Sequence, residues 1–162
     1  YIPVYPLAMS FLSRIGAALD AAGVRYALVG GYAVALHGAV RGTVDVDVIL
    51  AWDQRTLRAA EQALHGLGLV SRLPITADEV FRFRDEYLRN RNLIAWNFYN
   101  PRDLSEQLDI VISTDLKGKK VQAIQTADGP MRVLSRKDLI AMKRASGRPQ
   151  DLADIAALEK IQ

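Results

Sequence analysis

An apolar run from Val44 to Leu50 contains two carboxylates, Asp45 and Asp47. Side chains alternate faces along a β-strand, so both aspartates would point one way and the intervening valines the other. Two carboxylates about 6–7 Å apart along a strand are costly among Val and Ile without a counter-ion. A hard divalent cation relieves that cost, and Mg²⁺ accepts one or two carboxylates together with substrate phosphates. The run therefore predicts a strand with a metal-binding face.

A second feature precedes this run. A short apolar segment ends at Val29, meets the pair Gly30 and Gly31, and is followed by helix-forming residues up to Gly38. This order predicts a strand, a tight turn and a helix. Paired glycines leave the backbone open, and N–H groups at a helix start can donate to a phosphate. We therefore expect a phosphate-binding turn here.

The glycine pair followed by Asp45-x-Asp47 resembles the signature of the polymerase-beta-type nucleotidyltransferase superfamily. The flanking residues Arg41-Gly42-Thr43 resemble the R-x-T-x-D-x-D version of that signature. This version is found in small bacterial members, including the AbiEii-like toxin and minimal nucleotidyltransferase branches.

The resemblance extends towards the C-terminus. The family implies a third carboxylate on a later strand, and Asp109 within the apolar segment 108–112 supplies one. The stretch 138–155, which includes Lys143, resembles the C-terminal Lys-plus-Asp motif of the AbiEii-like branch. Together the matches span roughly residues 26–158. The glycine pair and the D-x-D are weak signals singly, but all four motifs in this order are specific.

The resemblance implies transfer of a nucleoside monophosphate from a nucleoside triphosphate, such as ATP, to an acceptor hydroxyl. It assigns Mg²⁺ or Mn²⁺ to Asp45 and Asp47, with Asp109 bridging to a second metal or taking the acceptor proton. Lys143 completes the predicted catalytic set. The predicted nucleotide-binding residues are Gly30, Gly31, Tyr32, Arg41 and Thr43. Tyr32 stands where many members carry Ser, so phosphate contact there falls to backbone groups.

Each of these features also has a purely structural interpretation. A Gly-Gly before a helix is often only a turn. The aspartate pair could form a solvated strand face, and Arg41 serves equally well in a turn or an ion pair. Arg148, Asp151 and Asp154 are interpreted as ion-pairing residues that clamp the last two helices, and Lys143 could belong to that clamp. Trp96 is expected in the core, with stacking on a nucleobase as the alternative.

The composition excludes several classes of protein. The chain has 162 residues, half of them apolar, which suits a single domain over 1–162. No stretch is long and apolar enough for a membrane helix, and no signal peptide is recognisable. The lack of cysteine excludes disulfides, thiolate catalysis and Cys-ligated zinc, and is compatible with a cytoplasmic protein. A net charge of +3 is too small to indicate nucleic-acid binding, although basic residues cluster at 72–91 and 117–120.

Periodicity and turn signals predict one α/β (α+β) domain, a mixed β-sheet flanked by helices. The expected strands are 24–29, 43–50, 69–74, 93–99, 107–113 and a hairpin of 120–127 with 131–134. The expected helices are 8–22, 32–38, 53–66, a segment after Thr76, and a helical C-terminal part over about 135–162. Leu152, Ile155 and Leu158 are expected to bury one side of the last helix. The three aspartates should meet at the edge of the sheet.

Two functions from different classes follow. The first is an active metal-dependent nucleotidyltransferase, with the toxin of a toxin–antitoxin pair and its cognate antitoxin partner as one form. The second is a non-catalytic nucleotide-binding or protein-interaction module with the same fold. The acceptor is left open between RNA such as tRNA, a protein and a small molecule, because no motif marks an acceptor site.

Overall fold

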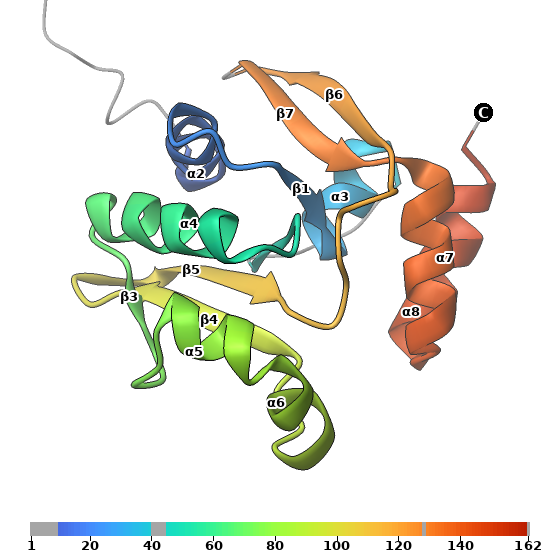
Figure 1. Cartoon of the computed structure of the whole chain (residues 1–162). Helices are drawn as coiled ribbons and strands as arrows, with labels where there is room; N and C mark the ends of the chain where they lie inside the picture. The colour runs from blue at the N-terminus through green and yellow to red at the C-terminus, as the bar shows by residue number, and fades with distance from the viewer. Residues whose placement is uncertain (1–9, 40–44, 128, 162) are drawn as a thin grey trace, which may run out of the picture.

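The computed structural model describes residues 10–39, 45–127 and 129–161 (Figure 1). Predicted nucleotide-binding residues Arg41 and Thr43 lie outside these ranges. The helices are α2 (Phe11–Ala21), α3 (Gly30–Leu36), α4 (Gln54–Gly66), α5 (Ala77–Arg82), α6 (Arg84–Asn90), α7 (Arg136–Ser146) and α8 (Pro149–Glu159). The strands are β1 (Tyr26–Val29), β2 (Val46–Leu50), β3 (Val70–Ser71), β4 (Ala95–Asn100), β5 (Asp103–Val111), β6 (Val121–Thr126) and β7 (Gly129–Leu134).

The strands form one mixed sheet in the order β3-β4-β5-β2-β1-β7-β6. The β1–β7 and β2–β5 pairs are parallel, and the other neighbours are antiparallel. Helices flank this sheet, and α7 and α8 form a hairpin at one side of the molecule, away from α5 and α6 (Figure 1). The predicted fold class is therefore confirmed. A single domain over the whole of 1–162 stays a prediction.

Alternation along the central strands separates the core from the opposite face of the sheet. Val46 and Val48 on β2 and Leu108 and Ile110 on β5 are at most 1% exposed. Such a period-2 pattern buries one face of a strand and leaves its other side chains available for a site. Asp47 and Asp109 occupy the intervening positions and are only half-buried.

Trp96 belongs to the core, as expected. Its ring is fully buried and tilts against Phe98 with 4.6 Å between the ring centroids. Its indole Nε1 donates to Ser71 Oγ at 2.8 Å, which satisfies the one polar atom of the side chain. The alternative in which Trp96 stacks on a nucleobase is therefore wrong.

The helix starts agree with the sequence signals in most places. Asp53 caps α4 by accepting from the Thr56 N–H, and Thr76 with Glu79 forms a reciprocal capping box on α5. At α7 only half of a capping box forms. Ser135 accepts from the Asp138 N–H, but the Asp138 carboxylate accepts from Lys120 N–H at 2.7 Å and so ties the helix to the strand β6 region instead.

The buried face of α8 differs from the prediction. Ile155 and Leu158 are buried, but Leu152 is 56% exposed. Asp151 and Asp154 occupy the inward positions because basic residues of the α7–α8 hairpin pair with them there. A buried carboxylate without a partner would be costly, so these ion pairs are what allows the two acids to occupy the inward positions.

Several strands begin or end at residues other than those predicted. β2 begins at Val46, so Asp45 precedes the strand instead of lying in it. β3 has only two residues, and β5 starts at Asp103, where it pairs with Asn100 across a bulged turn. None of the helices in the described part of the chain is long and apolar enough to cross a membrane.

Candidate active site

Strand register brings two of the predicted carboxylates together. β2 and β5 are parallel neighbours, and Asp47 lies directly opposite Asp109 in their register. Directly opposed residues of neighbouring strands point to the same face of the sheet, with the strands about 4.8 Å apart. We expected the aspartates to meet at the edge of the sheet, but β2 and β5 are both interior strands. Pairing of the sheet therefore creates a two-carboxylate centre that neither strand holds alone.

The remaining predicted carboxylate, Asp45, is placed differently. Asp45 is exposed and precedes β2, although its charge still acts on Asp47. Among the described residues, no group of three or more His, Cys, Asp or Glu side chains forms a set able to hold a metal ion. The structure thus brings together Asp47 and Asp109, whereas Asp45 lies before the start of β2.

The glycine turn lies against Asp47. Gly30 has a φ of +67°, the left-handed region that favours glycine, and α3 begins at this residue. A Cβ atom at position 30 would lie 2.3 Å from Asp47 Oδ2. Gly31 is buried and Tyr32 half-buried in the first turn of α3. Glycine at position 30 is therefore needed both for the turn and for the room that the carboxylate occupies.

Two polar residues that the sequence did not single out support Asp109. Asn97 is its register partner on β4, and the Asn97 Nδ2 donates to Asp109 Oδ1 at 2.8 Å. Arg72 Nε in turn donates to Asn97 Oδ1 at 2.7 Å and stacks on Tyr99. This chain fixes the orientation of the Asp109 carboxylate. Only the cross-strand register reveals it, because Asn97 belongs to no motif.

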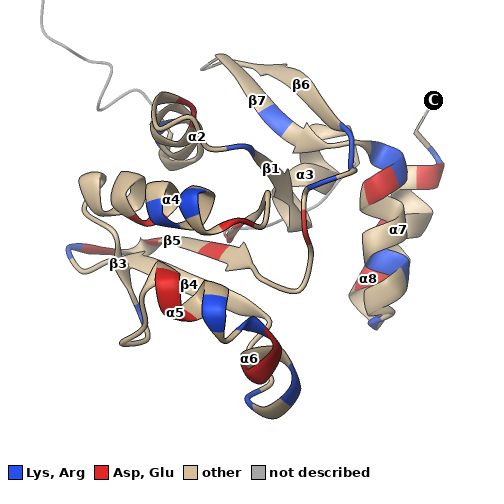
Figure 2. Cartoon of the chain, viewed as in Figure 1, with Lys and Arg blue, Asp and Glu red and all other residues tan. Residues whose placement is uncertain are grey.

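A cavity of about 550 Å³ is lined by both carboxylates. Its charged lining residues come from β2, β5 and the α7–α8 hairpin and are Asp47, Asp109, Lys143, Arg148 and Asp151. Gly30 also lines it, whereas Gly31 and Tyr32 do not. Both signs of charge appear on α7 and α8 in Figure 2. The fold therefore brings Lys143 to the same cavity as the glycine turn, far from it in sequence.

Lys143 is at once a cavity residue and part of the helix clamp. It is 7% exposed, and its Nζ lies 2.8 Å from Asp154 Oδ2 and 3.7 Å from Asp151 Oδ1. Arg148, which is largely exposed, binds Asp151 through its guanidinium at 2.8 Å. The ion-pairing interpretation of the last two helices is therefore confirmed, and Lys143 nonetheless faces the cavity that Asp47 lines.

Two carboxylates of this site have strongly shifted pKa values. Burial raises the pKa of Asp47 to about 6, and the charges of Asp109 and Asp45 add to the shift, while Lys143 and Arg148 oppose it. At Asp151 burial acts in the same direction, but hydrogen bonds from Arg148 and Ser146 outweigh it and lower the pKa to about 2. Arg148 therefore compensates Asp151 more fully than the two cations compensate Asp47.

The donor set suits a hard divalent cation. Burial and the facing charge of Asp109 raise the pKa of Asp47, and a cation held by the two carboxylates would favour their ionised forms. Mg²⁺ takes one or two carboxylates and completes its shell with water and phosphate oxygens. Asp47 and Asp109 are the residues that would hold it, and Asp45 precedes them on the chain.

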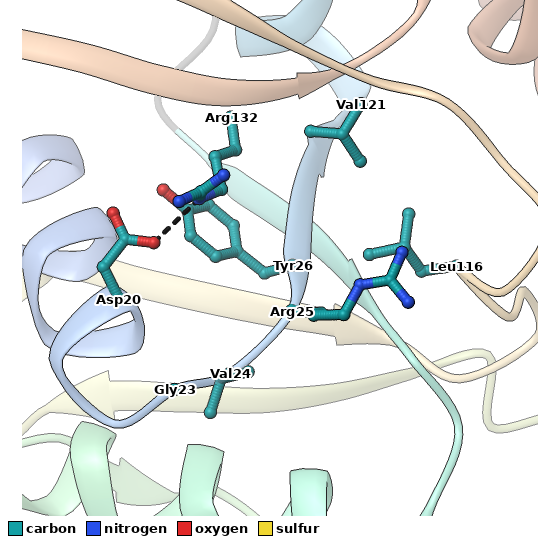
Figure 3. A pocket seen from close by; sticks show the side chains of 8 residues that line it. All are labelled: Asp20, Gly23, Val24, Arg25, Tyr26, Leu116, Val121 and Arg132. Carbon is teal, nitrogen blue, oxygen red and sulfur yellow. Dashed lines mark hydrogen bonds and ion pairs between the residues drawn. The ribbon is translucent and has the colours of Figure 1, made fainter.

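A second cavity, of about 350 Å³, opens near the start of β1 (Figure 3). Arg132 and Asp20 pair at 2.8 Å beside Tyr26, and Arg25 extends towards Leu116. Burial and the charge of Asp20 raise the pKa of Tyr26, so its phenol is protonated at neutral pH. None of the predicted site residues lines this cavity. The first cavity is therefore the candidate active site.

The fold that holds this site is that of the nucleotidyltransferases. No family model and no curated protein matches the chain by sequence. The antibiotic-resistance factor ANT(2'')-Ia has a similar solved structure, with a TM-score of 0.61 and 13% identity over 91% of this chain and 80% of that one.

Two further solved structures have the same fold. The lincosamide antibiotic adenylyltransferase LnuA gives a TM-score of 0.55 and 18% identity over 89% of this chain and 91% of its own. A nucleotidyltransferase-like protein from Paracoccidioides brasiliensis gives 0.54 and 16% over 91% of this chain and 72% of its own. At such identities the likeness concerns the fold alone.

Replacing Gly30 should expose how tightly the turn and Asp47 fit. We expect Gly30→Ala to lower the free energy of unfolding by about 2–3 kcal/mol, because left-handed strain adds to displacement of the carboxylate. Gly23→Ala is the matched control: its φ is +69° and no atom lies within 4 Å of a Cβ there. It should lose only the backbone contribution, about 1–2 kcal/mol. Equal losses in urea unfolding would contradict the contact.

The raised pKa of Asp47 predicts a pH-dependent stability in metal-free buffer. The carboxyl ionises near 3.8 when unfolded but near 6 when folded, so the folded state holds the proton more tightly. The neutral carboxyl makes its full contribution to the free energy of unfolding below about pH 4. This contribution is lost as the pH rises through 6. A shift of two units is worth about 3 kcal/mol, which solvent screening of this half-buried group reduces to about 1–2 kcal/mol. Urea unfolding between pH 4 and 7 should show this decline in the wild type and not in Asp47→Asn.

Proposed function

We propose that the chain is a metal-dependent nucleotidyltransferase that moves a nucleoside monophosphate from a nucleoside triphosphate to an acceptor hydroxyl. The observation that carries the proposal is the pairing of Asp47 with Asp109 in one cavity beside the Gly30 turn. The nucleotidyltransferase fold supports it. Cytoplasmic location, ATP as the nucleotide, the AbiEii-like branch, and a toxin role with a cognate antitoxin remain predictions.

Different residues of the site would serve different parts of the transfer reaction. In the transfer, the acceptor oxygen forms a bond to the α-phosphorus while the bond from that phosphorus to the bridging oxygen breaks, and pyrophosphate leaves. A bound Mg²⁺ or Mn²⁺ would supply charge neutralisation of the phosphates. Asp47 and Asp109 would hold it, and Asp109, which Asn97 orients, would take the acceptor proton.

Cations of the α7–α8 hairpin would serve the leaving group. Lys143 and Arg148 line the cavity and act electrostatically on Asp47. Positive groups already held in place stabilise charge that develops on departing pyrophosphate without reorganising during the reaction. Backbone groups at Gly30 and the neighbouring amides of Gly31 and Tyr32 would add contacts to the β- and γ-phosphates. Arg41 and Thr43, outside the described residues, keep their proposed role in nucleotide binding.

The second candidate is a nucleotide-binding or protein-interaction module without turnover. Its supporting observation is that the described carboxylates do not form a three-ligand metal set. The two candidates differ in one measurable respect, since only the enzyme releases pyrophosphate.

A transfer assay separates the candidates. The purified protein receives each labelled nucleoside triphosphate with Mg²⁺ or Mn²⁺ and, in turn, RNA including tRNA, protein and small-molecule fractions. Lincomycin and tobramycin join the panel because descriptions of neighbouring structures name a lincomycin complex and adenylyl-2''-tobramycin. We expect one fraction to become labelled with release of pyrophosphate, and Asp109→Asn to reduce the rate about 100–1,000-fold. Labelling no greater than that of Asp109→Asn in every fraction would favour the binding module.

The role of Lys143 can be separated from its ion pairs. Lys143→Met removes the cation and leaves Asp154 buried without it, so we expect a loss of about 3–5 kcal/mol in stability and a 10–1,000-fold lower single-turnover rate. Adding Asp154→Leu removes the stranded charge and should restore most of the stability without restoring the rate. Recovery of both quantities in the double variant would make Lys143 a structural residue only. Urea midpoints and rates are measured on the same samples.

A further inference from the structure

The second cavity shares no lining residue with the candidate active site. Its walls come from the end of α2, the segment that leads into β1, the loop before β6, and strands β6 and β7 (Figure 3). Its volume of about 350 Å³ lies at the lower end of the range of small-molecule pockets, about 300–1,000 Å³. The cavity is therefore large enough for a small ligand of its own.

The charged side chains of this cavity leave guanidinium donors without an acceptor. Asp20 and Arg132 pair at 2.8 Å, and this contact engages only the Nε of Arg132. Arg25 is exposed and extends towards Leu116 (Figure 3). In the part of the chain that the structure describes, its guanidinium has neither an ion pair nor a hydrogen bond. The lining thus carries two cations against one acid, and that acid is already paired.

The charges next to the cavity add to this excess. The loop over 113–120, which leads to Val121, contains three lysines and one aspartate. Figure 2 shows Lys and Arg on this loop, ahead of β1 and on β7, all of which border the cavity. A concave surface lined by one sign of charge raises the local concentration of the opposite ion. The surroundings of the cavity therefore favour an anion.

The remaining wall is aliphatic. Val24 and Leu116 are buried, and Val121 is 36% exposed at the start of β6. The backbone of Leu116 is held in place, since its N–H donates to the Leu50 carbonyl at 3.0 Å. A ligand that consisted only of an oxyanion would leave this apolar surface in contact with water.

We propose that the second cavity binds a small anion in which a carboxylate or phosphate group is attached to a compact apolar portion. The oxyanion accepts from the guanidinium of Arg25 and from the terminal nitrogens of Arg132, and the apolar portion packs on Val24, Leu116 and Val121. Guanidinium groups match the planar geometry of both oxyanions with paired hydrogen bonds. This inference does not depend on the proposed function, because it concerns a different cavity.

The test titrates the full chain with small probes in a buffer free of phosphate and carboxylate. Hexanoate and hexyl phosphate carry both parts of the proposed ligand, acetate and inorganic phosphate carry the oxyanion alone, and hexan-1-ol carries the apolar portion alone. Methyl NMR follows Leu116 and Val121 at this cavity and Val29 at the active site. We expect hexanoate or hexyl phosphate to bind about tenfold more tightly than its bare oxyanion and than hexan-1-ol, and to shift Leu116 and Val121 but not Val29. The preferred amphiphilic probe identifies the oxyanion.

A variant pair tests the role of the guanidinium. Arg25→Met keeps an unbranched stem and removes the charge, so we expect it to weaken binding of the preferred probe about tenfold. Arg102→Met is the matched control, because Arg102 is exposed in the turn between β4 and β5 and does not line the cavity. It should leave binding unchanged.

Several outcomes would overturn the site. They are unchanged affinity in Arg25→Met, equally tight binding of hexan-1-ol, shifts confined to Val29, and no binding of either amphiphilic probe. The transfer assay addresses the other cavity, so the anion site and the transferase proposal can fail independently of each other.

Discussion

Parallel pairing of β2 with β5 places two carboxylates opposite each other within one cavity, and the arrangement of the site depends on that pairing. The sheet fixes Asp47 and Asp109 by their backbones, so their repulsion cannot be relieved by moving the strands apart. Burial raises the pKa of Asp47, and the charge of Asp109 adds to that shift. The turn at Gly30 then has to leave room for one of these carboxylates, which only a residue without a side chain does.

The α7–α8 hairpin supplies the opposite charge. Its short connection through Gly147, in the left-handed conformation, lets α8 fold back so that Asp151 and Asp154 meet Lys143. Burying a lysine is costly unless acids accompany it, and α8 provides two. The same pairs that hold the helices together therefore hold a cation in the cavity. Structural and chemical interpretations of Lys143 are not exclusive here.

The cavity combines charged and aliphatic lining residues. The glycine turn, both carboxylates and the cations Lys143 and Arg148 line it together with aliphatic side chains from the sheet and from α7. The supporting chain from Arg72 through Asn97 to Asp109 keeps the second carboxylate oriented.

The sequence by itself determined the local features: the alternating strand around Asp47, the glycine turn, and the helices that start near Asp53 and after Thr76. These depend on a few neighbouring residues, whose backbone and side-chain preferences act without the rest of the chain. It also indicated which carboxylates belong together, through the order of the motifs.

The tertiary structure determined which side chains of different strands and helices become neighbours. Alternation says that Asp47 and Asp109 each face away from the core, but only the β2–β5 register makes them neighbours, and only the β4–β5 register brings Asn97 to Asp109. Likewise, the apolar spacing predicted that Leu152 is buried. In the structure Asp151 and Asp154 lie on the buried side of α8 instead, where they form ion pairs across the α7–α8 hairpin. The physical reason is that burial of a charge depends on its partner, and the partner's position is a property of the assembled fold.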